Sequence, residues 1–182
     1  METIWLCVFF LAGVSSVNAS CLSCASSRPP CPSNNCTYTC PSNWILEKDY
    51  CYFFGSDTKT QTWTQAEKTC QDMGGHLPSI HDNVQNEFLA VKAYKTSGYP
   101  HFWSGLSVNN QTKFLEWSDG CATDFSNWAK KQPLAPEGGM CIVITINVQF
   151  APFKLWGFEW SVAHCEAELP TTICMKAPNI VL

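Results

Sequence analysis

Apolar residues recur at helical spacing in the first part of the folded region of this chain. Four of them follow one another three or four positions apart: Trp63, Ala66, Cys70 and Met73. Thr62 and Gln65 stand where the two partners of a capping box would stand, and Gly74 follows the last apolar residue. The pattern predicts a helix that begins after Thr62 and ends before Gly74.

A second helix is predicted shortly after the first. Asp82 is its N-cap, and Ser97-Gly98 marks its end. The helical spacing places three apolar side chains on one face: Val84, Phe88 and Val91.

Farther along, the spacing shortens to that of strands. Short apolar or alternating runs, separated by Asn, Asp, Gly and Pro, lie at 102–106, 114–117, 141–148, 158–160 and 173–176, and one precedes the first helix at 50–54. Two early helices and late short strands predict an α+β domain.

Both ends of the chain differ in composition from this domain. Residues 4–14 are apolar and are followed by small residues at 17 and 19, so 1–19 are predicted to be a secretory signal peptide. The run is too short to span a bilayer, although an uncleaved membrane anchor is the alternative. Residues 20–39 form a Cys-, Ser- and Pro-rich arm whose order would come from its disulfides. The domain is assigned to 40–177 and a tail to 178–182.

Charge and cysteine content limit the classes of partner and the redox environment that the chain could have. Cleavage of the signal peptide would remove Glu2, one of the 15 acidic residues, so the mature chain would have 14 acidic and 11 basic residues. This balance predicts neither a nucleic-acid nor a membrane-surface partner. No membrane span is predicted after signal cleavage. Of 12 cysteines, Cys7 also leaves, and the odd number that remains indicates disulfides with at least one sulfur left over. Asn35 and Asn110 begin sequons and are predicted glycosylation sites.

Several short motifs follow one another in an order that is more specific than any one of them. Cys40-Pro-x-x-Trp44 precedes Cys51-Tyr52, and then come WTQAEKTC, HLPSI, FWSGL, FLEWSDG, FSNW and ICMK. Together they resemble the C-type lectin-like domain, in the long form with an extra N-terminal hairpin, over residues 40–177. The resemblance implies two helices, short antiparallel sheets and a long loop region, stapled by disulfides.

Three disulfides are implied by the resemblance: Cys40–Cys51, Cys70–Cys174 and Cys141–Cys165. The second closes a loop of roughly 100 residues, which corresponds to about 4.7 kcal/mol on the chain-entropy model. The resemblance also implies that six residues belong to the core and its turns: Trp103, Gly105, Leu106, Trp117, Trp128 and Trp160.

Sugar-binding members of this family hold calcium in a loop of the type Glu-Pro-Asn or Gln-Pro-Asp. An acidic residue before the next cysteine and an Asn-Asp pair after a late tryptophan complete the site. The matching positions here are Gln132, Pro133, Leu134, Gly139, Ser161 and Val162. They keep one amide and one hydroxyl oxygen and no carboxylate, whereas calcium takes six to eight oxygens. Nothing in the sequence places Glu137, the one carboxylate of the loop, at the site. We therefore expect no calcium ion there and no other cofactor.

Two features depart from the family. An insertion between Cys141 and Cys165 carries five large apolar residues: Phe150, Phe153, Leu155, Trp156 and Phe158. Such a turn either binds a ligand or folds back over the domain, and the candidate ligand-binding residues are Gln132, Phe153, Trp156 and Phe158. Cys121 is the second departure, because it has no family partner. It bonds either a cysteine of the arm or a second copy of the chain.

Catalytic chemistry is not indicated, because the four histidines lack metal-ligand spacing and neither GxSxG nor a phosphate loop occurs. The sequence predicts a secreted, non-enzymatic binding protein for a glycan or an extracellular protein, without calcium at the usual site. The alternative is a structural protein that forms disulfide-linked oligomers. A role in innate immunity is implied by the resemblance alone.

Overall fold

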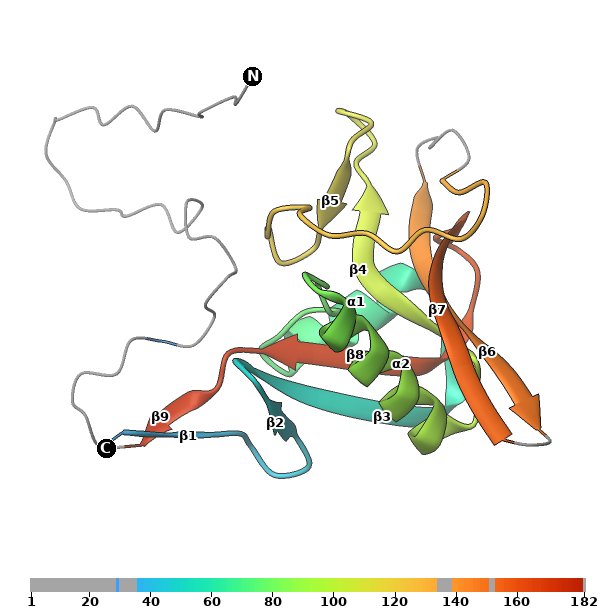
Figure 1. Cartoon of the computed structure of the whole chain (residues 1–182). Helices are drawn as coiled ribbons and strands as arrows, with labels where there is room; N and C mark the ends of the chain where they lie inside the picture. Colours follow the sequence, from blue (N-terminus) through green and yellow to red (C-terminus); the bar gives the residue numbers. More distant parts are fainter. Residues whose placement is uncertain (1–28, 30–35, 134–138, 151–152, 182) are drawn as a thin grey trace, which may run out of the picture.

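The computed structural model describes residues 29, 36–133, 139–150 and 153–181. Its strands form three small sheets, and two helices flank them (Figure 1). The predicted signal peptide, Cys21, Cys24, Cys31 and the sequon at Asn35 lie outside the described residues.

All strand pairs within the three sheets are antiparallel, as the sequence predicted. The first sheet consists of β1 (Thr37–Thr39) and β9 (Asn179–Val181). The second has the order β2 (Ile45–Glu47), β3 (Tyr50–Gln61) and β8 (Leu169–Lys176). The third has the order β5 (Leu115–Trp117), β4 (His101–Val108), β6 (Met140–Phe150) and β7 (Phe153–His164).

Both helices begin and end where the sequence predicted. In front of α1 (Trp63–Asp72), Thr62 Oγ1 accepts a hydrogen bond from the Gln65 amide at 3.3 Å, and Gln65 Oε1 accepts one from the Thr62 amide at 3.0 Å. In front of α2 (Asn83–Ser97), Asp82 Oδ1 accepts a bond from the Gln85 amide at 2.6 Å. Gly98, with φ 76°, ends α2 in the left-handed conformation that glycine tolerates. The capping box and both caps are therefore confirmed.

The main core cluster contains Trp160, which is fully buried. Three aromatic rings meet Trp160 edge-on: Trp117 at 5.8 Å, Phe125 at 5.7 Å and Trp128 at 5.6 Å between ring centroids. Edge-to-face pairs of this kind add to the free energy of burial. A second cluster under α1 contains Trp103 and the Cys70–Cys174 disulfide. The predicted core role of the tryptophans is confirmed.

The three implied disulfides are present, with Cα–Cα distances of 5.6 Å for Cys40–Cys51, 5.2 Å for Cys70–Cys174 and 5.0 Å for Cys141–Cys165. Cys36 and Cys121 are also disulfide-bonded.

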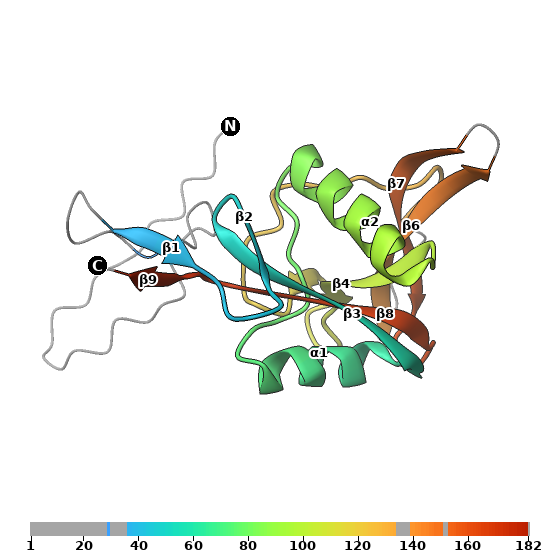
Figure 2. The same cartoon turned by 90° about the horizontal axis from the view of Figure 1, so that it is seen from below.

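The two ends of the domain lie side by side. Residues 37–39, which the sequence assigned to the arm, pair with residues 179–181 of the predicted tail, and this ribbon extends away from the other sheets (Figure 2). The end of β6 and the start of β7 lie at the opposite side of the molecule in both views. Neither helix of the described chain is long and apolar enough to cross a membrane.

Candidate ligand-binding site

The loop that matches the calcium site of the family reaches β7 through Gln132. The backbone N–H group of Gln132 donates to the Ala129 carbonyl at 2.9 Å, and the Gln132–Pro133 peptide bond is cis. The side-chain oxygen of Gln132 accepts a hydrogen bond from the backbone amide of Val162 at 3.3 Å. The amide oxygen that could face a cation is therefore engaged with the protein's own backbone. Leu134 and Glu137 lie outside the described residues.

At Gln132 and Ser161, the oxygens that could bind a metal ion are neutral. Ser161 and Val162 lie in β7 opposite Val143 and Ile142 of β6. Within the described ranges, which omit 134–138, no group of three or more His, Cys, Asp or Glu side chains could hold a metal ion. Calcium affinity increases with the number of charged ligands, so the absence of calcium at Gln132 stays a prediction that rests on ligand chemistry.

The inserted segment is the outer part of the β6–β7 hairpin, and β7 contains a bulge there. Thr145 pairs with Glu159 and Asn147 with Trp156, so Gly157 and Phe158 together stand opposite one residue of β6. Gly157 has φ 88° and Phe158 has φ 48°. Simple alternation would place Trp156 and Phe158 on the same face. The extra residue places them on opposite faces.

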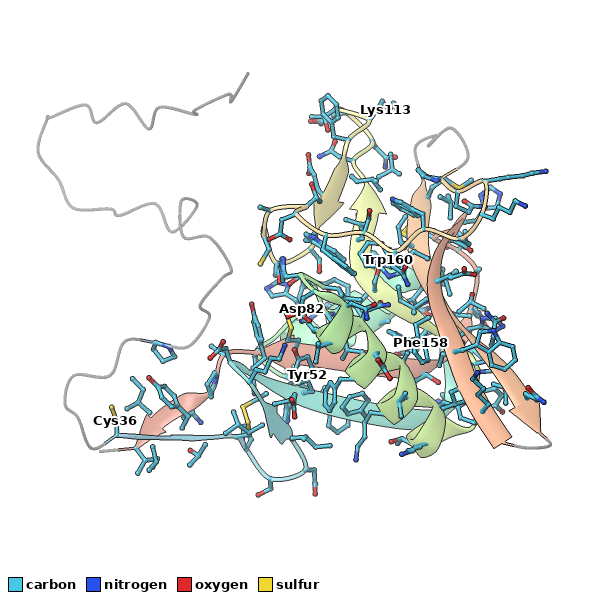
Figure 3. All side chains as sticks on the ribbon, in the orientation of Figure 1. Cys36, Tyr52, Asp82, Lys113, Phe158 and Trp160 are labelled. Carbon is cyan, nitrogen blue, oxygen red and sulfur yellow. A yellow bond between two sulfur atoms is a disulfide. The ribbon has the colours of Figure 1, made fainter. Side chains whose placement is uncertain are left out.

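Phe158 faces inward as a result. Its side chain is half-buried against the main core, and Figure 3 shows it beside α2. Its carbonyl oxygen accepts bonds from two side-chain amides, Asn86 Nδ2 at 2.9 Å and Asn127 Nδ2 at 2.9 Å. The fully buried Asn86 also accepts a bond from Trp160 Nε1 at 2.9 Å. One asparagine of α2 thus holds β7 on both sides of Glu159.

Trp156 faces outward and is 42 % exposed. Strand pairing places Asn147 directly opposite it, and the same face continues through the Thr145–Glu159 pair to His101 of β4 and through the Gln149–Lys154 pair toward the turn. We call this surface the Trp156 face. It combines an indole ring with amide, ammonium, hydroxyl and carboxylate groups. Burial lowers the pKa of His101, which favours its neutral form.

The structure separates the four residues that the sequence suggested as one ligand site. Gln132 contacts β7 at Val162. Because a strand rises roughly 3.3 Å per residue, Val162 lies on the order of 20 Å along β7 from Trp156. Phe153 begins β7 opposite Phe150, and its side chain lies outside the described part. Of the four, Trp156 is the large aromatic side chain that the structure shows exposed.

A serine, a histidine and an aspartate that the sequence did not connect lie in one hydrogen-bonded row. His81 Nδ1 lies 2.6 Å from Asp124 Oδ1, and His81 Nε2 lies 3.0 Å from Ser79 Oγ. Ser79 is fully buried, and its hydroxyl donates to Asp119 Oδ2 at 2.5 Å. A nucleophile must reach substrate, so this row is a structural link between the start of α2 and the loop after β5. Ser79 and His81 are neighbours in the sequence, but Asp119 lies 40 positions from Ser79 and Asp124 lies 43 positions from His81, so no local pattern joins the aspartates to them.

Two further positions concern the predictions of glycosylation and of covalent assembly. Asn110 is exposed in the loop between β4 and β5, where a sequon is accessible. Cys121, which the sequence assigned either to the arm or to a second copy, is half-buried and disulfide-bonded within the chain.

Comparisons with known proteins agree with this architecture. Residues 59–176 match the Lectin C-type domain family. The chain is 38% identical over 137 residues to C-type lectin BML-1 of Bungarus multicinctus, covering 73% of this chain and 81% of that protein. It is 33% identical over 138 residues to the low affinity immunoglobulin epsilon Fc receptor of Homo sapiens, over 75% of this chain and 38% of the receptor, so it spans well under half of that relative.

A solved structure shows the same fold. The cow C-type carbohydrate-recognition domain of CD23, crystallised in the presence of a GlcNAc2Man3 oligosaccharide, superposes with a TM-score of 0.63 at 28% identity, covering 79% of this chain and 99% of that one. These relatives are named as lectins and receptors. With the family match over more than half of its length and the implied disulfides in place, the chain belongs to the C-type lectin domain family.

Proposed function

We propose that this protein is a secreted binding protein that holds a glycan against the Trp156 face, without a calcium ion at Gln132. The observation that carries the proposal is the outward position of Trp156, which the bulge at Gly157 separates from the inward-facing Phe158.

The Trp156 face has the two kinds of group that sugar recognition needs. An exposed indole offers a flat apolar surface to the C–H face of a pyranose ring. Asn147, Lys154 and Glu159 supply donors and acceptors for hydroxyl groups around it. A dry contact with a protein would leave these polar groups buried and in need of partners, at a cost of about 1–3 kcal/mol for each unsatisfied group. The polar surroundings of Trp156 therefore favour a glycan over a protein ligand.

The chemistry of the Gln132 loop supports calcium independence. The side-chain oxygen of Gln132 already accepts the Val162 amide, and the family's Asn-Asp ligand pair is replaced by Ser161 and Val162. A calcium ion would have to break that hydrogen bond and would gain no carboxylate from these positions.

A covalent assembly protein is the competing proposal. Under this proposal, Cys121 was a candidate for a disulfide to a second copy of the chain. Because Cys121 is disulfide-bonded within the chain, an intermolecular bond would have to use another cysteine. A non-reducing gel of the secreted protein that shows a monomer supports the binding function, and a ladder of covalent oligomers supports assembly.

A glycan array with and without EDTA tests the main proposal. Trp156→Ala should lower the affinity for the best glycan at least tenfold, as expected for an aromatic anchor, and EDTA should leave binding unchanged. Phe114→Ala is the matched control, because Phe114 is 72 % exposed and precedes β5, away from the hairpin. Loss of binding in EDTA, or equal binding by Trp156→Ala and the unchanged protein, would overturn the proposal.

A further inference from the structure

A pocket distinct from the Trp156 face opens between the β2–β3 turn and the start of α2. Its volume is about 150 Å³, and it is lined by the aromatic residues Tyr50, Tyr52 and Phe88 and by residues of the turn. Figure 3 shows Tyr52 and Asp82 on neighbouring elements at this place. A single water needs roughly 15 Å³, so the pocket admits a group of several heavy atoms.

The aromatic side of the pocket is held rigidly. Ring centroids of Tyr50 and Tyr52 lie 6.1 Å apart, and those of Tyr52 and Phe88 lie 5.4 Å apart. Tyr52 is 2 % exposed, and its hydroxyl oxygen accepts a bond from Gln85 Nε2 at 3.0 Å. Val84, which is 59 % exposed, adds apolar surface from the first turn of α2.

The remaining lining is negatively charged. It contains the carboxylates of Glu47, Asp49 and Asp82, the ammonium group of Lys48 and the imidazole of His81, so carboxylates outnumber the ammonium group three to one. Lys48 Nζ lies 2.9 Å from Asp82 Oδ2. The backbone amide of Gln85, followed by Lys48, lowers the pKa of Asp82, so this carboxylate stays ionised.

We propose that this pocket binds an organic cation, the guanidinium or ammonium group of a basic side chain that a protein partner presents. Aromatic faces attract a cation through their quadrupole, and the carboxylates add a direct charge attraction. Neither attraction acts on a neutral or anionic group. The site involves neither Trp156 nor Gln132, so it does not depend on the proposed glycan binding.

A second groove indicates that the cation belongs to a peptide segment. A hollow of about 420 Å³ continues along α2 from the shared residues Val84 and Phe88, past Glu87 and Val91, to Lys92 and Lys95. A bound segment would place its basic residue in the pocket, an apolar side chain on Val84 and Val91, and an acidic residue near the two lysines. A free small cation would use the first part alone.

An NMR titration of the full mature chain tests both parts. The probes are acetyl-arginine amide, tetramethylammonium chloride, acetyl-alanine amide and the peptide acetyl-Arg-Leu-Leu-Glu-amide. We expect the two simple cations to shift the ring signals of Tyr50 and Phe88 saturably, the alanine amide to leave them in place, and the peptide to bind at least tenfold more tightly than arginine amide.

Charge variants distinguish the pocket from general attraction by an acidic protein. Glu47→Gln should weaken cation binding about fivefold, the effect of removing one charge at a few ångströms through solvent. Glu166→Gln removes the same charge from an exposed position outside the pocket and should leave binding unchanged. Equal shifts by the alanine amide, or equal weakening by the two variants, would overturn the cation site. Peptide affinity no higher than that of arginine amide would overturn the peptide partner.

Discussion

Replacing Asn86 by leucine is expected to destabilise the domain by about 2–3 kcal/mol, although leucine has nearly the same size. Asn86 is fully buried on α2 and joins two points of β7, because it accepts from Trp160 Nε1 and donates to the Phe158 carbonyl, both at 2.9 Å. The substitution removes both bonds at once.

The two losses differ in size. Trp160 is fully buried, so its Nε1–H group would be left without an acceptor, which costs about 1–3 kcal/mol. The Phe158 carbonyl keeps the Asn127 side chain as a donor at 2.9 Å, so this second loss is about 0.5–1.5 kcal/mol. The apolar area that leucine buries offsets a part of the sum.

Urea unfolding of the oxidised protein measures the effect. With a slope of about 1–3 kcal/mol per M urea, the midpoint should fall by roughly 1 M. Asn127→Ala is the comparison, because Asn127 donates to the same carbonyl from a half-buried position. The double variant leaves the Phe158 carbonyl without either donor, so it should lose at least about 0.5 kcal/mol more than the sum of the single variants. A midpoint unchanged in Asn86→Leu, or strict additivity, would refute the reasoning.

Four further expectations concern the scaffold. Thr62→Ala should cost about 1 kcal/mol in urea unfolding, because it removes the side-chain cap of α1. Gly105→Ala should cost about 1–3 kcal/mol, since its Cβ would lie 2.6 Å from the Leu77 carbonyl oxygen. Replacing Cys70 and Cys174 by serine should lower stability by about 4.7 kcal/mol and prevent folding at 37 °C, as far-UV circular dichroism would show. The pKa of Asp82 is lower in the folded state than its ordinary value of 3.8, so ionised Asp82 stabilises the fold above that value and this stabilisation is lost as the pH falls below it. Between pH 5 and pH 3, Asp82→Asn should therefore lose less stability than the unchanged protein, as thermal unfolding would measure.

Local signals in the sequence were sufficient for the scaffold. The Thr62–Gln65 capping box and the glycine at 98 determine helix ends through neighbouring residues, so both helices could be predicted. The disulfides followed from the ordered motifs of the family. These features rest on short-range contacts or on a pattern that spans the whole domain.

The candidate site was less predictable because it depends on one inserted residue. Alternation along β7 groups Trp156 with Phe158, and the bulge that separates them arises from pairing with β6. Sequence periodicity does not reveal which strand carries the extra residue. The His81–Asp124 contact was missed for a related reason, since 43 positions separate the two residues. The cation pocket likewise combines the β2–β3 turn with α2, which meet through tertiary packing alone.

The paired ribbon of β1 and β9 determines how this protein can be mounted for measurement. Thr37 and Val181 are register partners, and both views place the β1–β9 ribbon across the molecule from the end of β6 and the start of β7. An affinity tag or biotin added after Val181 would hold the β6–β7 hairpin, which carries Trp156, at the far side of the molecule from a sensor chip. Immobilisation through random surface lysines would instead modify Lys154 on the Trp156 face in part of the population.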